Sequence, residues 1–403
     1  MRSPGSASPL SSSRDPPARS RPLPPAPAQG SPSQVHGHFA AAKLTLRRAD
    51  LLLHPRAKTP TMYGYPPDAP VGRSTDDAQD VTPRQRLPPA FESHAFTVQS
   101  ARDAGIGLGR LQGRDLARPF WGMRMPAASA ESRLLRAAPW PDERRGQTAQ
   151  RRIRALAHAY APRLKPGQFF SHLTAARLHG IPLPAAFDRH ELLDVSVPSP
   201  RRAARAVGIQ GHKQVVSSAD VHLLEGLPVS SPAQAWIELA PLLSAEDLVC
   251  VGDYLLWWRH PRATLQELKF AVGSRHGRPG VAMLAEILPI LTDRADSPPE
   301  SRIRYRFLRA GLPTVAVNEE IYDAQGMFIA LPDLAFRRYR MVIDYEDDHH
   351  RTDRVQWQKD ISRVPRLEAA NWHSTRVSAQ DLRDSRELIC RIRRLLRERG
   401  WIG

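Results

Sequence analysis

Acidic residues occur near the C-terminus of this chain in a pattern suited to metal binding. Asp333 follows Pro332 at the expected start of one strand, and eleven residues later Asp344 and Glu346 alternate along the apolar segment MVIDYE. Residues i and i+2 of a strand face the same side, so we expect Asp344 and Glu346 to point together toward Asp333. Glu300, on the preceding helix, would complete the group. Carboxylate oxygens suit Mg²⁺ or Mn²⁺, and such ions activate water for phosphodiester hydrolysis. We therefore predict a metal site on Asp333, Asp344 and Glu346.

Adjacent strands must bring these carboxylates together. From Glu300 onward the sequence predicts a helix, a strand, a turn, two strands, a helix, a strand and a closing helix that runs through Arg399. Asp323 and Gly326 mark a hairpin turn between strands, and Gly311 with the following Leu-Pro marks a helix end. We expect an α/β domain over residues 297–403.

The C-terminal segment resembles the PD-(D/E)XK nuclease superfamily, specifically its branch related to very-short-patch mismatch-repair endonucleases. The resemblance covers about residues 297–383 and rests on ordered phrases: DYEDDHHR at 344–351, Asp360 with Arg363, and Asn371 and Trp372 followed by Arg376 and Val377. It implies a restriction-endonuclease-like α/β domain with a mixed central sheet.

The resemblance also implies roles for individual residues. Asp333 and Asp344 would bind metal, Glu346 would assist or bind a second ion, and His350 would act as general acid/base or orient the phosphate. Imidazole suits that role because its ordinary pKa is about 6.5.

Three departures from the nuclease pattern keep two alternatives open. Glu346 replaces the usual lysine, Asp344 is one methylene shorter than the usual glutamate, and Asp347 replaces the usual glycine. The fold could therefore be retained with a site that no longer cuts. Alternatively, DYEDDHHR is a solvated acidic turn.

The middle of the chain resembles AbiEi-type antitoxin-like proteins of actinobacteria. The phrases FFSHLTAARLHGIPLP and LPVSSPAQAWIELA carry this resemblance, which covers about residues 95–260. It implies a winged-helix-like segment at 95–147, a mostly helical middle domain at 148–294, and descent from a DNA-binding regulator with a possible toxin partner. Ser171 is expected to cap a helix that stops at Gly180. His172 and His179 share a helical face, where packing or capping roles are more common than metal binding.

A pattern typical of a helix-turn-helix, with a wing-like strand at 120–125, occurs in the segment AFTVQSARDAGIGLGRLQGRDLARPFWGMRMP. The two helices would pack through Val98, Ala101, Ala104, Leu108, Leu111 and Leu116. Arg110, Gln112 and Arg114 could then face DNA. The alternative is a small helical subdomain whose arginines lie in solvent.

The charge balance favours a polyanionic partner. There are 58 Lys and Arg against 41 Asp and Glu, which gives a net charge of +17 and a pI of about 10.7. An arginine-rich composition could also reflect a GC-rich genome. The predicted contacts to the DNA backbone are Arg302, Arg304, Arg306, Arg351, Arg354, Lys359 and Arg363.

The first 90 residues hold 17 of the 38 prolines and lack a sustained apolar period, so we expect a disordered leader at 1–90. Two alternatives are translation from Met62 and an organellar transit peptide.

Cys250 and Cys390 provide no disulfide framework, and no apolar run could span a bilayer, which favours the cytoplasm and excludes a membrane protein. The preferred interpretation is a Mg²⁺-dependent endonuclease. The alternative is a non-catalytic DNA-binding regulator or antitoxin.

Overall fold

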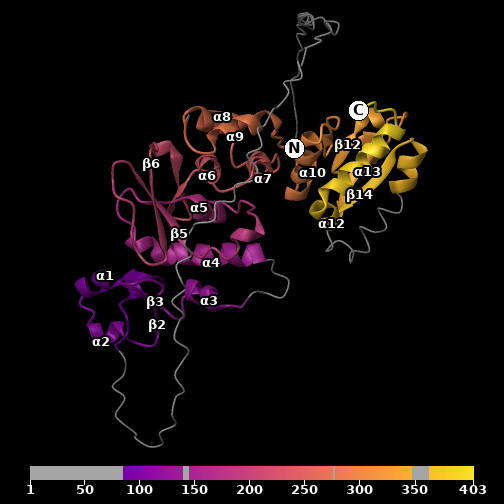
Figure 1. Cartoon of the computed structure of the whole chain (residues 1–403). Coiled ribbons are helices and arrows are strands. Elements are labelled where there is room, and N and C mark those ends of the chain that lie inside the picture. Colours follow the sequence, from indigo (N-terminus) through magenta and orange to yellow (C-terminus); the bar gives the residue numbers. More distant parts are fainter. Residues whose placement is uncertain (1–84, 139–144, 276, 347–362) are drawn as a thin grey trace, which may run out of the picture. The chain divides into compact units, whose positions relative to one another are not determined.

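The computed structural model describes residues 85–138, 145–275, 277–346 and 363–403 (Figure 1). The chain divides into the units Met1–Gln79 and Asp80–Gly403, and every described residue belongs to the second. That unit is a mixed α/β structure with several sheets, as expected. Most of the predicted leader, including Met62, lies outside the described residues. Among the described residues, no helix has the length and apolarity needed to cross a bilayer.

The first described segment combines short helices with a three-stranded antiparallel sheet of order β1-β3-β2. Thr97 caps the first helix by accepting a hydrogen bond from the Ser100 amide at 2.9 Å. The predicted helix contact is only partly formed, because Ala101, Leu111 and Leu116 are buried whereas Leu108 is 56% exposed. The elements are β1 (Phe96–Thr97), α1 (Val98–Asp103), α2 (Leu108–Leu111), β2 (Leu116–Ala117), β3 (Met123–Pro126) and α3 (Ala130–Arg136).

Two structural features lie across the expected boundaries of this segment. Packing begins before residue 95, since Leu87 is buried with Phe96 and the ring of Phe91 lies 4.9 Å from that of Phe96. Helix α4 (Arg145–Tyr160) crosses the expected boundary between 147 and 148. At the first of these places, apolar side chains before the predicted range extend the packed structure.

The middle region contains more helix than strand, as predicted. It contains a five-stranded mixed sheet of order β6-β5-β4-β8-β7, in which β5 pairs with β6 and β4 with β8 in parallel. Helices and sheet share one core around Trp236, which is fully buried. The strands are β4 (Phe169–Phe170), β5 (Leu193–Pro198), β6 (Ile209–Gln214), β7 (Val221–Leu224) and β8 (Leu227–Ser230). The helices after α4 are α5 (His172–Leu178), α6 (Pro232–Leu239), α7 (Ala245–Leu256), α8 (Leu265–Gly273) and α9 (Val281–Ile287).

Buried side chains organise the start of α5. Ser171 holds the N-cap position but makes no side-chain cap hydrogen bond. Instead, the Glu238 carboxylate accepts from the His172 amide at 2.7 Å, and Asp194 accepts from the Thr174 amide at 3.2 Å. Negative charge at a helix N-terminus is favourable, so two distant carboxylates replace the predicted local cap. Helix α6 has a local cap instead, because Ser231 Oγ accepts a hydrogen bond from the Gln234 amide.

The C-terminal region is built on the four-stranded sheet β14-β13-β12-β9, in which only the β13–β14 pair is parallel. The predicted hairpin is confirmed by the antiparallel pair β10–β11, with Gly326 at φ +79°. The strands are β9 (Ala316–Val317), β10 (Ile321–Tyr322), β11 (Phe328–Ala330), β12 (Leu334–Phe336), β13 (Met341–Glu346) and β14 (His373–Ser378). The helices are α10 (Pro298–Arg309), residues 363–369, α12 (Ala379–Arg383) and α13 (Ser385–Glu398).

Both faces of this sheet are covered. Helices α10 and α13 pack on one face, where Leu388, Ile392 and Leu396 of α13 are fully buried at a spacing of four residues. The hairpin β10–β11 and Leu367 cover the other face, against Val342. Each fully buried Leu or Ile contributes about 1.5–3 kcal/mol. This packing fixes the relative positions of β12 and β13, which carry the candidate site.

Candidate active site

The neighbouring antiparallel strands β12 and β13 bring Asp333 and Asp344 together. Asp333 immediately precedes β12, and its side-chain Oδ2 accepts a hydrogen bond from the Tyr345 amide of β13 at 2.7 Å. In return, the Asp333 amide donates to Asp344 Oδ1 at 3.4 Å. The predicted adjacency of these two carboxylates is therefore present in the structure.

Asp333 lies in an unfavourable place for a negative charge. Burial, together with the nearby charges of Glu300 and Asp344, raises the pKa of Asp333 to about 7, although the Tyr345 amide and Arg363 oppose this rise. The carboxyl of Asp333 thus changes charge close to neutral pH. Perturbation of this kind occurs both at functional sites and in buried ion networks.

Glu300 is buried and satisfied by three donors. Its carboxylate accepts from Ser297 Oγ at 2.6 Å, from the Asp296 amide at 3.0 Å and from Asn318 Nδ2 at 2.7 Å. Burial raises the pKa of Glu300, and these hydrogen bonds oppose the increase. Glu300 therefore lies close enough to act on Asp333 electrostatically while its oxygens are bound elsewhere.

Asn318 is a positioning residue that the sequence analysis missed. It has a left-handed backbone (φ +46°), its amide donates to the Asp333 carbonyl at 3.0 Å, and its side chain binds Glu300. Asparagine adopts this conformation more readily than most residues. No local pattern identifies Asn318, because its two partners lie on different elements.

Glu346 does not join the other three carboxylates. Its half-exposed side chain forms an ion pair with Arg376 of β14, which lies beside β13 on the side away from β12. The expectation that Glu346 points with Asp344 toward Asp333 is thus replaced by a cross-strand pair. His350, Arg351, Arg354, Lys359 and Asp360 lie outside the described residues.

The described donors fit a hard divalent cation modestly. No group of three or more His, Cys, Asp or Glu side chains among the described residues is arranged to hold a metal. Mg²⁺ commonly uses only one or two carboxylates, with water and substrate phosphates as its other ligands. Asp333 and Asp344 supply such a pair, and a bound cation would offset the repulsion from Glu300 and Asp344 that, after burial, helps to raise the pKa of Asp333.

The three arginines of α10 that were expected to contact DNA form ion pairs within the protein. Arg302 binds Glu246 at 3.2 Å and Asp247 at 2.7 Å, and Arg306 binds Glu246 at 2.8 Å. Arg304 forms an ion pair at 2.7 Å with Asp253, which is buried. These carboxylates all belong to α7, against which α10 packs. The structure thus assigns these arginines to the contact between α7 and α10.

The three N-terminal DNA-contact candidates differ in exposure. Arg110 binds Asp115 at 2.8 Å with a side chain only 11% exposed, so its charge is already balanced. Arg114 and Gln112 are exposed. Of this predicted set, the structure leaves Arg114 and Gln112 accessible to a partner.

His172 and His179 pack within the fold, as expected of histidines at this spacing. His179 is hydrogen bonded to the Ser230 carbonyl at 2.7 Å. His172 stacks on His212, with ring centroids 3.7 Å apart, and Nε2 of His212 lies 2.8 Å from Asp194. Burial lowers the pKa of His172 to about 4, which leaves it neutral at pH 7.

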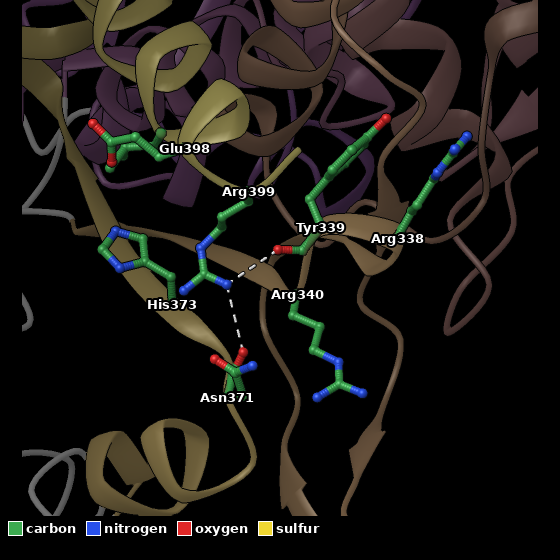
Figure 2. A pocket seen from close by; sticks show the side chains of 8 residues that line it. Arg338, Tyr339, Arg340, Asn371, His373, Glu398 and Arg399 are labelled. Atoms are coloured by element: carbon green, nitrogen blue, oxygen red, sulfur yellow. Dashed lines mark hydrogen bonds between the residues drawn. The ribbon is translucent and has the colours of Figure 1, made fainter. Parts of the chain in front are cut away.

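A basic pocket of about 570 Å³ lies beside the first residues of β13 and β14. Figure 2 shows the Arg399 guanidinium directed at the backbone carbonyls of Tyr339 and Asn371, at 3.3 and 3.5 Å. Arg338 and Arg340 are exposed at its edge. The sequence analysis missed this pocket, because three separate segments contribute to it. Its surplus of arginines suits a phosphate-bearing ligand.

Comparisons with known proteins do not assign a family. No family model matches the chain. Two relatives from Mycobacterium tuberculosis, the uncharacterized protein MT2308 (strain CDC 1551 / Oshkosh) and the uncharacterized protein Rv2248 (strain ATCC 25618 / H37Rv), are each 27% identical over 211 residues. The matched region covers 52% of this chain and 74% of each relative.

One solved structure, the RV2827C protein from Mycobacterium tuberculosis, matches at 16% identity over 57% of this chain and 83% of that chain. Its TM-score of 0.31 is too low to support an argument about fold. The resemblances to nucleases and antitoxins thus remain predictions.

Proposed function

We propose that this chain is a DNA-associated protein of the cytoplasm whose C-terminal region hydrolyses phosphodiester bonds with the help of Mg²⁺ or Mn²⁺. The observation that carries the proposal is the buried position of Asp333 beside Asp344 and Glu300, which raises its pKa to about 7. The restriction-endonuclease-like character of the sheet, and the winged-helix character of residues 95–147, belong to the same proposal.

Each residue of the candidate site that the structure describes has a part in this chemistry. Asp333 and Asp344 would hold the divalent ion, which when bound activates water and neutralises charge on the scissile phosphate. Asp333 can accept or release a proton near neutral pH. Glu300 and Asn318 hold the loop before β12 in place. Arg363, beside Asp344, offers a guanidinium that can bind phosphate oxygens.

A plasmid-nicking assay tests the proposal. The full chain is incubated with supercoiled DNA and Mg²⁺ or Mn²⁺, alongside Asp333→Asn, Asp344→Asn and, as control, Asp293→Asn, which alters an exposed carboxylate. We expect nicking by the wild type and the control, and a loss of at least a hundredfold in the two site variants. Salt-sensitive DNA binding without nicking at any metal concentration would overturn the enzymatic proposal.

That outcome would support the second candidate, a non-catalytic DNA-binding regulator or antitoxin. One observation favours it: Arg363 already neutralises Asp344, as expected of a site that no longer binds a cation. An antitoxin would in addition need a toxin partner. Co-purification with the product of a neighbouring gene would test for that partner.

A further inference from the structure

Trp121 stands at the tip of a tight turn between β2 and β3. The Met123 amide donates to the Phe120 carbonyl at 3.1 Å, and Gly122 takes the positive φ of +73° that the third position of such a turn requires. The indole is 84% exposed. Tryptophan carries one of the largest apolar surfaces of any side chain, so its exposure on a fixed turn suggests a partner.

A cavity of about 720 Å³ lies beside this side chain. We call it the Trp121 pocket and define it by Trp121, Phe120, Arg118, Arg124 and Arg163. Thr97, Val98, Gln99 and Gly122 complete its wall, so no carboxylate belongs to the described lining. Its size falls within the range of ordinary ligand pockets, about 300–1,000 Å³.

Three arginines line the Trp121 pocket together. Arg124 is fixed by donating to the carbonyls of Leu111 at 2.6 Å and Met123 at 2.7 Å. Arg163 donates to the Trp121 carbonyl, and its guanidinium lies 5.5 Å from the indole centroid. Burial and the charge of Arg118 lower the pKa of Arg124. No ion pair joins these arginines to a carboxylate within the described part of the chain, so an anionic ligand would relieve their repulsion.

A second tryptophan provides a contrast. Trp258 is 48% exposed and also lies under two guanidinium groups, those of Arg259 at 4.8 Å and Arg294 at 5.5 Å. There, however, Arg259 pairs with Asp296 at 3.2 Å and Arg294 lies 3.9 Å from Asp293. Within the described residues, the arginines around Trp258 have carboxylate partners, whereas those around Trp121 have none.

We propose that the Trp121 pocket binds single-stranded nucleic acid, with one unpaired base stacked on the Trp121 indole and the adjacent phosphates bound by Arg118 and Arg163. An exposed aromatic ring beside a positively charged groove is the arrangement that recognises unpaired bases, because every base has a face to stack. A duplex keeps its bases stacked on one another and offers only phosphates. This proposal concerns binding and does not depend on cleavage by the C-terminal region.

The test measures the affinity of the full chain for labelled 12-mers by fluorescence anisotropy at fixed salt. The probes are single-stranded DNA, single-stranded RNA of the same sequence, and duplex DNA. The variants are Trp121→Ala, Trp121→Phe, Arg118→Gln and the matched control Trp258→Ala. EDTA is present throughout, so that a failed nuclease proposal does not alter the result.

We expect Trp121→Ala to weaken single-strand binding about 5- to 150-fold, the range that corresponds to one stacked base at about 1–3 kcal/mol. Trp121→Phe should recover part of this loss, Arg118→Gln should reduce the salt dependence, and Trp258→Ala should stay within about twofold of the wild type. Tighter binding of either single strand than of the duplex supports the proposal, and the preferred strand identifies the natural source. Equal affinity for duplex and single strand, or wild-type binding by a folded Trp121→Ala protein, would overturn it.

Discussion

One guanidinium nitrogen of Arg363, Nη2, lies 2.8 and 2.9 Å from the two carboxylate oxygens of Asp344. This pair joins the helix at 363–369 to β13 and places a fixed positive charge beside Asp333, whose pKa it lowers against the larger effects of burial and Glu300. The Arg363 guanidinium thus supplies the positive charge that a metal ion would otherwise supply at Asp344. A divalent ion would have to compete with it.

Replacing Arg363 with glutamine tests this competition. We expect the concentration of Mn²⁺ that gives half-maximal thermal stabilisation to fall about tenfold, because Asp344 becomes free to bind the ion. Without metal, the free energy of unfolding should fall by about 1–3 kcal/mol, as the partly buried Asp344 loses its charged partner. Arg366→Gln, at an exposed position on the same helix, is the control. An unchanged Mn²⁺ midpoint in Arg363→Gln would contradict the competition.

The substitution Asp333→Asn should stabilise the protein at alkaline pH. The folded-state pKa of about 7 lies above the ordinary 3.8, so the neutral carboxyl favours folding below about pH 4. This advantage is lost as the pH rises through 7. Asparagine cannot ionise, yet its oxygen can still accept from the Tyr345 amide. We expect a gain on the order of 2–4 kcal/mol at pH 8 and almost none at pH 4.

Urea unfolding in EDTA at both pH values checks this expectation. The same gain at pH 4 and pH 8 would show that the effect of Asp333→Asn is not electrostatic. Saturating Mg²⁺ should reverse the ranking at pH 8, since only the wild type keeps both carboxylates.

Asp194 should show the opposite pH dependence. Burial alone would raise its pKa, but interactions with His190 and His212 lower it to about 2. The resulting stabilisation is present above pH 4 and is lost as the pH falls toward 2. We expect Asp194→Asn to cost about 2 kcal/mol at pH 7 and much less at pH 2, measured by urea unfolding. The exposed Asp293→Asn is the control, and a loss that persists at pH 2 would contradict the electrostatic explanation.

The reassignment of the α10 arginines can also be tested. Arg302→Ala should lower the free energy of unfolding by about 1–3 kcal/mol, because Glu246 and Asp247 lose a partner. It should leave the slope of log affinity for DNA against log salt unchanged. Arg338→Ala, in the basic pocket of Figure 2, is the comparison and should reduce that slope by about one if Arg338 contacts a phosphate. A reduced slope for Arg302→Ala without loss of stability would restore its predicted role at DNA.

Local periodicity allowed part of the C-terminal fold to be predicted from the sequence. The alternation in MVIDYE and the turn at Asp323 to Gly326 place strands where they occur, because each signal depends on a few neighbouring residues. The same strand pattern predicts that adjacent strands bring Asp333 and Asp344 together. It could not predict the partner of Glu346, since Arg376, with which Glu346 forms an ion pair, lies thirty residues later in the chain.

The sequence by itself determined the strand pattern and the residue types at the acidic site. Tertiary structure alone decided which charges are paired. It placed Arg302 and Arg304 against the carboxylates of α7 and Arg363 on Asp344, and it gave Arg118 and Arg163 no carboxylate partner among the described residues. The physical reason is that periodicity is a local property of the chain. The energy of a charge depends instead on its burial and on partners brought close from distant segments.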